Sequence, residues 1–124
     1  MKKVGMMLFV LTVLLSACGT NGEDNTVIVG GKNFTEQIIL THMMGDLLAE
    51  RTDLDVVKEV GIGVTNVVHP AIVNDEIDIY AEYTGKAYMS MLNMEIDPQN
   101  TEDADTVYER VQEGYNEEFD ISWL

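Results

Sequence analysis

Two short segments carry polar and aromatic side chains directly at the ends of predicted strands, where they could bind a small molecule. Residues 31–37 read GKNFTEQ and include Lys32, whereas residues 83–86 read YTGK and place Lys86 three residues after Tyr83. In open α/β sheets, ligands bind beyond the carboxyl ends of the strands. Tyr83 is therefore either a packing residue at the end of a strand or one wall of a ligand pocket.

Three short runs, rich in apolar and β-branched residues, predict the strands that would position these segments. They cover residues 26–30, 55–61 and 77–83, and the two segments lie at the carboxyl ends of the first and the third. Each strand is followed by a segment with helical periodicity. Strands that alternate with helices in this way predict an α/β domain, in which a mainly parallel sheet is flanked by helices.

The first helix is predicted to run to about Arg51. Asn33 and Glu36 have the separation of a capping box, which would begin this helix. Its apolar residues recur at helical spacing, as expected for a helix that covers one face of the sheet. They are Ile39, Leu40, Met43, Met44, Leu47 and Leu48.

Three further helices are predicted along the rest of the chain. Residues 65–75 are expected to form a helix that either starts near Pro70 or bends there, because proline lacks a backbone N–H. Thr84 is expected to cap a short helix. Residues 101–115 form the last predicted helix, whose apolar residues make a single stripe.

The chain lacks the sequence motifs of common catalytic sites. It contains no G-x-S-x-G, no phosphate-binding loop that ends in Lys-Ser/Thr and no Cys/His pair for a nucleophile. Residues 61–63, GIG, lack the third glycine of a dinucleotide fingerprint. His42 and His69 have no metal-ligand partners at helical spacing, so surface or packing roles are expected. The sequence therefore favours a binding protein without metal or cofactor over an enzyme.

The segments GKNFTEQ (residues 31–37) and DIYAEYTG (residues 78–85), in this order and separation, resemble the N-terminal lobe of substrate-binding proteins of osmoprotectant ABC importers. The resemblance covers residues 27–124. It implies a periplasmic-binding-protein-like (type II) lobe that binds glycine betaine, choline, carnitine or a related quaternary ammonium compound. It also implies that an ABC permease and its ATPase subunits are partners.

The resemblance further implies a role for each of three side chains. A trimethylammonium group has no N–H, so aromatic faces select it through cation–π attraction and dispersion. Tyr83 matches the tyrosine that this lobe would give to such a cage, and Lys32 looks like the residue that meets the ligand's polar or carboxylate end. Lys86 departs from the family pattern, which often has a small polar or acidic residue there. It would favour a zwitterion such as glycine betaine or a carnitine-like compound over choline, unless it points to water.

The N-terminus has the pattern of an export signal. Lys2 and Lys3 precede a nearly continuous apolar run over residues 6–15. This run suits a signal-peptide core and is shorter than the roughly 20 residues of a membrane span. We therefore expect a signal peptide over residues 1–17.

The only cysteine follows this predicted signal peptide. Residues 15–18, LSAC, resemble a bacterial lipobox, in which cleavage occurs before the cysteine and its thiol carries a lipid. A lipidated Cys18 followed by a flexible tether, together residues 18–26, would anchor the protein on the extracytoplasmic face of the cell membrane. A buried free cysteine or a simple secretory peptide are the alternatives.

The charge of the chain limits its partners. All 22 acidic residues follow the predicted signal peptide, which contains two of the seven basic residues, so the exported chain would carry a net charge near −17. This argues against nucleic acid and anionic lipid as partners. The charge would keep an exported domain soluble, or could attract a cationic solute.

The length of the chain sets an expectation for affinity. Family members have a second lobe, so residues 27–124 are expected to form an incomplete first lobe, truncated before the second, which binds a ligand very weakly or not at all alone. A micromolar complex needs about 8 kcal/mol, whereas one cation–π contact contributes roughly 0.5–2 kcal/mol. Two alternatives remain: a binding protein for another small zwitterion or amino acid, and a lipoprotein with a structural or docking role and no ligand.

Overall fold

The computed structural model describes residues 25–99 and 102–124. The predicted signal peptide and Cys18 lie outside the described residues. Within them, no helix is both long enough and apolar enough to cross a membrane. The elements are, in order, β1 (Thr26–Lys32), α2 (Thr35–Arg51), β2 (Asp55–Gly63), α3 (Thr65–Val73), β3 (Ile79–Tyr80), α4 (Thr84–Lys86), the π-helical turn η1 (Ala87–Met91) and α5 (Ala104–Phe119).

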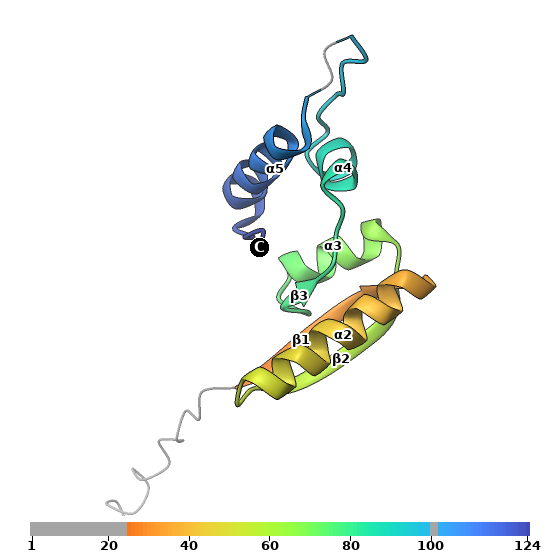
Figure 1. The fold of residues 1–124 in the computed structure, drawn as a ribbon, viewed down its shortest axis with the longest axis vertical. Helices are drawn as coiled ribbons and strands as arrows, with labels where there is room; N and C mark the ends of the chain where they lie inside the picture. Colours follow the sequence, from red (N-terminus) through yellow and green to blue (C-terminus); the bar gives the residue numbers. More distant parts are fainter. Residues whose placement is uncertain (1–24, 100–101) are drawn as a thin grey trace, which may run out of the picture.

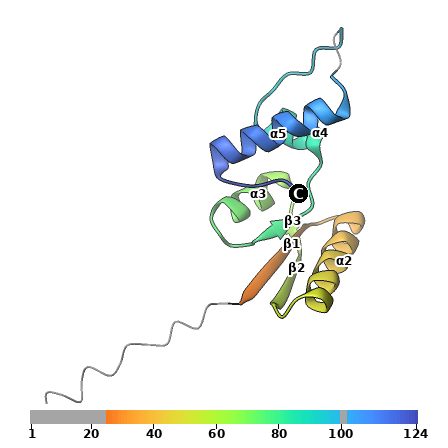
Figure 2. The same cartoon turned by 60° about the vertical axis from the view of Figure 1, so that its left-hand side comes forward.

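The strands of the described chain form one parallel sheet in the order β2-β1-β3. β2 therefore lies on one side of β1 and β3 on the other, and each strand is reached by a crossover connection. Since such crossovers are right-handed, these two steps put α2 and α3 on opposite sides of the sheet, as Figure 2 shows. The predicted α/β architecture is confirmed.

The central strand β1 extends two residues beyond the prediction, which treated position 32 as part of a loop. A shift of register between Gly30 and Lys32 lets Lys32 pair with Gly63, and Asn33 N–H then donates to Gly63 O at 2.9 Å. Gly61 has a φ of 73°, a left-handed conformation that glycine adopts without strain. The extra pairing makes Lys32 part of the sheet.

The third strand is shorter than predicted. It covers Ile79–Tyr80 rather than residues 77–83. Asp78 still joins β1, because its N–H donates to Ile28 O at 2.9 Å and its carboxylate accepts from Ile28 N–H at 2.7 Å. After Tyr80 the chain leaves the sheet and leads into α4.

The start of α2 does not use the predicted capping box of Asn33 and Glu36. Its N-cap is Phe34, and no side chain makes a capping hydrogen bond. Asn33 is still held by β2 through its backbone, so it lies too early to cap the helix. The prediction failed because the strand continues further than its sequence suggested.

The face of α2 that meets the sheet is small and polar. Its buried residues are Gln37, Thr41 and Gly45, which recur every four positions. Thr41 Oγ1 donates to Gln37 O at 2.8 Å and lies 3.2 Å from Gly30 O. A Cβ added to Gly31 would lie 2.0 Å from Thr41 Oγ1. The helix therefore approaches β1 so closely that large side chains do not fit between them.

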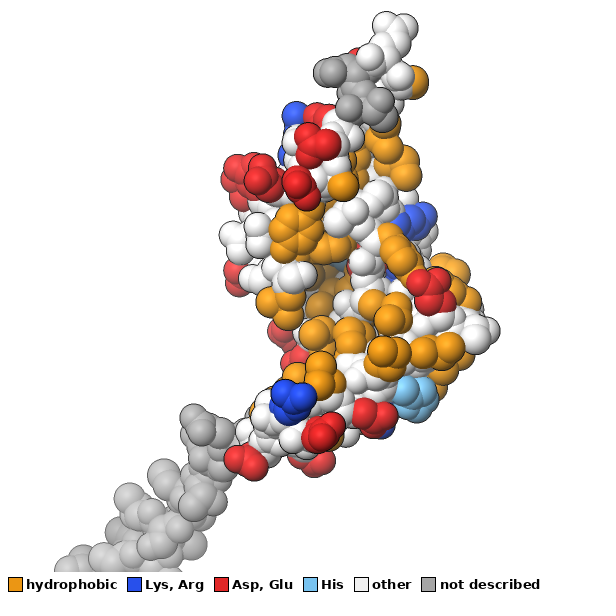
Figure 3. Space-filling view, viewed as in Figure 1, with side chains coloured by type: hydrophobic (Ala, Val, Ile, Leu, Met, Phe, Trp, Pro, Cys, Tyr) orange, Lys and Arg blue, Asp and Glu red, His pale blue; other side chains and the backbone are white. Residues whose placement is uncertain are grey.

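The predicted apolar stripe of α2 consequently lies partly outside. Ile39, Met43 and Leu47 are 52%, 62% and 55% exposed. In the space-filling view, hydrophobic side chains form part of the visible surface around α2 and the sheet (Figure 3). Close backbone packing, rather than apolar periodicity, decides which face of this helix meets the sheet.

The predicted helix over residues 65–75 is α3, which begins at Thr65 and continues through Pro70, so the alternative of a start near the proline is excluded. The predicted cap of the next helix needs correction. α4 has Tyr83 as its N-cap and Thr84 as its first residue, with no side-chain capping bond, so Thr84 is not the cap. The chain enters α4 in an extended conformation at Tyr83, which places this residue between the strand and the helix.

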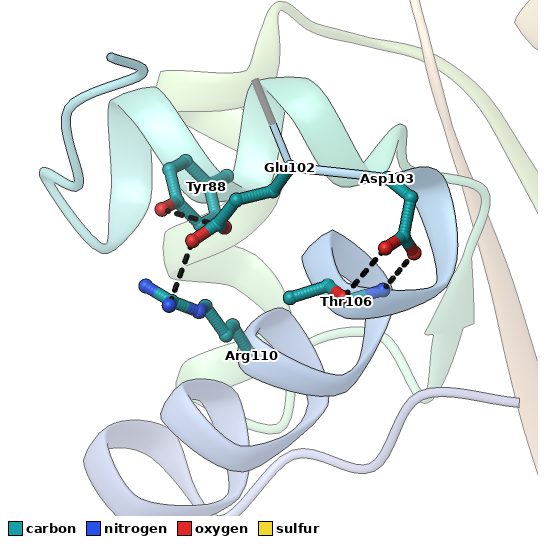
Figure 4. Close-up of polar contacts among 5 residues, drawn as sticks. All are labelled: Tyr88, Glu102, Asp103, Thr106 and Arg110. Atoms are coloured by element: carbon teal, nitrogen blue, oxygen red, sulfur yellow. Dashed lines mark hydrogen bonds and ion pairs between the residues drawn. The ribbon is translucent and has the colours of Figure 1, made fainter. Parts of the chain in front are cut away.

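The last helix is capped by a side chain. Asp103 accepts from Thr106 N–H at 2.9 Å and from Thr106 Oγ1 at 3.0 Å (Figure 4), and these bonds lower the pKa of Asp103. Glu102 pairs with Arg110 at 2.7 Å and accepts from the Tyr88 hydroxyl at 3.3 Å. The predicted start, Thr101, lies outside the described residues, and α5 ends at Phe119, one turn beyond the prediction.

The described chain has two hydrophobic clusters. Val68, Ala71 and Ile77 form one beside the sheet. The other lies away from the sheet, where η1 packs against α5, and it consists of Ala87, Tyr88, Leu92, Val111 and Tyr115 (Figure 1). His69 of α3 links the sheet region to α5, because its ring lies edge-on to Tyr115 and Phe119 at centroid distances of 5.3 and 4.6 Å.

Candidate functional site

The two segments singled out in the sequence meet in one pocket. The pocket has a volume of about 390 Å³ and lies at the carboxyl end of β1, between the segments that follow β2 and β3. All three predicted binding residues, Lys32, Tyr83 and Lys86, line it. Its other walls are Phe34, Val64, Thr65 and Asn66.

The register of the sheet explains why Lys32 meets Glu82. Gly30 of β1 pairs with Tyr80 of β3. Two residues further along each parallel chain, Lys32 and Glu82 come to lie side by side, and Lys32 Nζ forms an ion pair with Glu82 Oε1. Both side chains are only 3% exposed. The ammonium of Lys32 is therefore fixed and neutralised within the protein.

The same carboxylate also holds the backbone of Tyr83. Glu82 Oε1 accepts from the Tyr83 N–H at 2.8 Å. Lys32 Nζ lies 5.4 Å from the centroid of the Tyr83 ring and 6.0 Å from that of Tyr80, within the range of cation–π attraction. One carboxylate thus positions both the buried cation and the aromatic residue beside it.

The two rings near Lys32 differ in exposure. Tyr83 is 42% exposed and offers its ring to the pocket. The nearby Glu36 carboxylate raises the pKa of the Tyr83 phenol, and the Gln37 side chain opposes this effect. Burial raises the pKa of Tyr80, whose hydroxyl has no hydrogen-bond partner in the described chain. Tyr83 is therefore the ring available to a ligand, whereas Tyr80 supports the site from behind.

The short helix α4 places Lys86 on the pocket wall. Both Lys86 N–H and Ala87 N–H donate to Tyr83 O at 2.9 Å, which forms a tight first turn. Lys86 is exposed and lines the pocket together with Tyr83. Unlike Lys32, it has no ion-pair partner among the described residues. Its ammonium is the cation that a ligand's carboxylate could reach.

Two residues of the site were given no role from the sequence. Glu82 is part of the EYTG segment, but its importance depends on the β1–β3 register. Gln37, in GKNFTEQ, is 1% exposed, and neither atom of its carboxamide has a hydrogen-bond partner in the described chain. A buried polar group without a partner is a candidate to contact a ligand or water. Both residues belong to the segments singled out in the sequence, since Glu82 directly precedes Tyr83 and Gln37 ends GKNFTEQ.

A second and larger hollow lies on the other side of β3. It has a volume of about 730 Å³, and β3, the end of α3 and residues 119–124 line most of it. The hydroxyls of Tyr80 and Tyr115 lack hydrogen-bond partners, and burial raises the pKa of Tyr115 to about 12. Glu82 borders this hollow and its partner Lys32 borders the smaller pocket, so their ion pair lies between the two cavities.

The chain is similar in sequence to a carnitine transport protein and to an ergothioneine transport protein. Carnitine transport binding protein OpuCC of Listeria monocytogenes (serotype 1/2a, strain 10403S) is 29% identical over 124 residues, which cover 96% of this chain and 39% of OpuCC. The ergothioneine transport permease/ergothioneine binding protein EgtU of Helicobacter pylori (strain G27) is 31% identical over 103 residues, which cover 82% of this chain and 17% of EgtU. The chain thus spans well under half the length of these relatives.

A solved structure shares the fold of this chain, and a protein family matches its sequence. A crystal structure of a glycine betaine/carnitine/choline ABC transporter aligns with a TM-score of 0.66 and 19% identity, over 82% of this chain and 36% of that one. Residues 25–124 match the family described as the substrate binding domain of ABC-type glycine betaine transport system. The chain therefore belongs to this family of substrate-binding domains.

Proposed function

We propose that the pocket of Lys32, Tyr83 and Lys86 is one half of a binding site for a zwitterionic quaternary ammonium compound, such as glycine betaine or carnitine. The observation that carries the proposal is the exposed Tyr83 ring, which shares a pocket with the unpaired ammonium of Lys86. The ring suits the trimethylammonium group. Lys86 suits the carboxylate, whereas the ammonium of Lys32 is already paired with Glu82.

The names of two relatives support this ligand class. OpuCC is a carnitine transport binding protein and EgtU an ergothioneine binding protein. Carnitine and ergothioneine each combine a trimethylammonium group with a carboxylate. In the proposed role, the chain belongs to an ABC importer and passes its ligand to a permease with ATPase subunits.

The affinity of this half-site is expected to be low. One cation–π contact contributes about 0.5–2 kcal/mol, and an exposed ion pair about 0–1 kcal/mol. Their sum is below the roughly 4 kcal/mol of a millimolar complex. We therefore expect a dissociation constant above about 1 mM, and submicromolar binding in calorimetry would contradict this half-site.

Lys86 provides the direct test of the ligand class. Lys86→Gln should weaken glycine betaine and leave choline unchanged or slightly stronger, because only glycine betaine has a carboxylate. Lys86→Arg is the matched control and should keep the wild-type preference. NMR titrations of both ligands measure this, and an equal effect of Lys86→Gln on both would refute the carboxylate contact.

We also propose that the chain is exported and carries a lipid on Cys18, which would hold it at the extracytoplasmic face of the cell membrane. The support is the apolar run followed by LSAC at residues 15–18. Metabolic labelling with a fatty acid tests this in cells. Wild type should incorporate the label and Cys18→Ala should not; equal labelling would refute it.

A further inference from the structure

The buried cation Lys32 poses a problem for any pocket that binds a cation on Tyr83. Its ammonium lies 5.4 Å from the centroid of the Tyr83 ring, and its side chain is 3% exposed. Water therefore screens it little. A ligand cation on the same ring would lie within about 8 Å of Lys32, where an uncompensated unit charge would weaken binding by at least about tenfold at an effective dielectric constant near 20.

Glu82 is placed to remove this repulsion. Its Oε1 pairs with Lys32 and accepts from the Tyr83 N–H, so the negative charge lies between the cation and the residue that presents the ring. Lys86 is the remaining cation on the pocket wall, and the other wall residues are neutral. Glu36, beside the Tyr83 phenol, lies on α2 outside the pocket lining.

We propose that Glu82 sets the charge selectivity of the pocket: by cancelling the charge of Lys32, it leaves the Tyr83 ring attractive to a cation. Glu82 is thus a positioning and specificity-determining residue that does not itself touch the ligand. This inference rests on the proposed function for its ligand class. It differs from a purely structural role of the ion pair, because it predicts that the sign of the preferred ligand charge depends on Glu82.

The test compares choline with its uncharged carbon isostere, 3,3-dimethylbutan-1-ol, in the full chain. Chemical shifts of the Tyr83 ring report binding, and the ratio of the two affinities is the readout. Glu82→Gln should lower the choline-to-isostere ratio by about tenfold. The double variant Lys32→Met/Glu82→Gln should restore the ratio to within about threefold of wild type.

A second variant keeps the test decisive if Glu82→Gln does not fold. Lys32→Met leaves Glu82 negative without its partner and should raise the choline-to-isostere ratio, the opposite direction. A purely structural role would change both affinities together in every variant. An unchanged ratio in the folded variants, or a double variant as poor as Glu82→Gln, would overturn the proposal.

A third probe, acetate at neutral pH, separates this inference from the proposed function. Glu82→Gln should gain acetate-dependent shifts at Tyr83 beyond the response that Lys86 gives in wild type and the double variant, because Lys32 is then an additional unpaired cation. If wild type shows no preference for choline over the isostere, the proposed function fails, and acetate still decides whether Glu82 compensates Lys32. Absence of this additional acetate response would mean that Lys32 is not a charged group in need of compensation, and the inference would fail.

Discussion

The two hollows of this chain differ in chemistry more than in size. The pocket at Lys32, Tyr83 and Lys86 is about half the volume of the hollow beyond β3. Its buried charges are paired, and an aromatic ring and an unpaired ammonium face the space. The larger hollow is lined by aliphatic and aromatic side chains from β3, α3 and the segment that follows α5, together with four acidic residues and no Lys or Arg. The Tyr80 and Tyr115 hydroxyls there lack hydrogen-bond partners in the described chain.

Volume is therefore a poor guide to the binding site in this fold. A site for a charged small molecule needs its internal charges neutralised and held, so that the remaining groups act on the ligand. The smaller pocket meets this condition through Glu82. The larger hollow has no Lys or Arg in its lining, so it offers no cation to the carboxylate of a zwitterion.

The largest expected effect is on stability at the smaller pocket. Glu82→Gln should lower the free energy of unfolding by about 3–5 kcal/mol, because it leaves the Lys32 ammonium buried without its partner. Lys32→Met/Glu82→Gln should recover most of this loss. Urea unfolding measures both. As a control, Asp46→Asn removes the exposed partner of Lys58 and should cause no measurable change; equal losses at the two pairs would refute the buried character of the first.

The next effect concerns ligand binding at Tyr83. Tyr83→Leu should weaken quaternary ammonium ligands by about two- to thirtyfold, the range of one cation–π contact. Tyr83→Phe keeps the ring and should bind within about twofold of wild type. NMR titration with glycine betaine compares them. If leucine binds as well as phenylalanine, the aromatic face is not what selects the ligand.

A smaller effect is expected in the larger hollow. Tyr115→Phe removes a buried hydroxyl that has no hydrogen-bond partner in the described chain. It should leave the free energy of unfolding unchanged or raise it by about 1 kcal/mol, since no bond is lost. A clear loss of stability in urea unfolding would show that the Tyr115 hydroxyl makes a stabilising hydrogen bond and would contradict this prediction.

The smallest effect is a pH dependence of stability that comes from His69, whose ring contacts those of Tyr115 and Phe119. Burial lowers its pKa below the usual 6.5, and Glu82 opposes the shift only in part. The folded state therefore binds the proton less readily, so this contribution to stability is complete above about pH 6.5 and is lost as the pH falls through the lowered pKa. His69→Gln should reduce the loss of stability between about pH 7.5 and 5.5; an unchanged pH profile would contradict this account.

The sequence predicted the architecture because alternating strands and helices leave few arrangements for a parallel sheet. It also predicted that Lys32, Tyr83 and Lys86 meet, since segments at the carboxyl ends of neighbouring parallel strands share one edge. The ion pair of Lys32 with Glu82 could not be predicted in this way. It requires the β1–β3 register and two additional residues in β1, and both follow from pairing across the sheet rather than from local sequence.

The buried face of α2 shows a second limit of sequence patterns. Apolar spacing favoured Ile39, Met43 and Leu47 as core residues, but Thr41 and Gly45 occupy that place. The distance between a helix and a sheet depends on the side chains of both. A glycine at position 31 allows an approach that excludes larger residues, and periodicity within one segment contains no such information.

An NMR titration of this chain with glycine betaine, at concentrations well above the expected dissociation constant, tests whether the ligand binds in the smaller pocket, because it follows all aromatic rings at once. Tyr83 lines the smaller pocket, whereas Tyr115 and Trp123 line the larger hollow. We predict a saturable shift of the Tyr83 ring resonances and none at Tyr115 or Trp123. Shifts confined to Tyr115 and Trp123, or an unshifted Tyr83 ring, would contradict the assignment of the site.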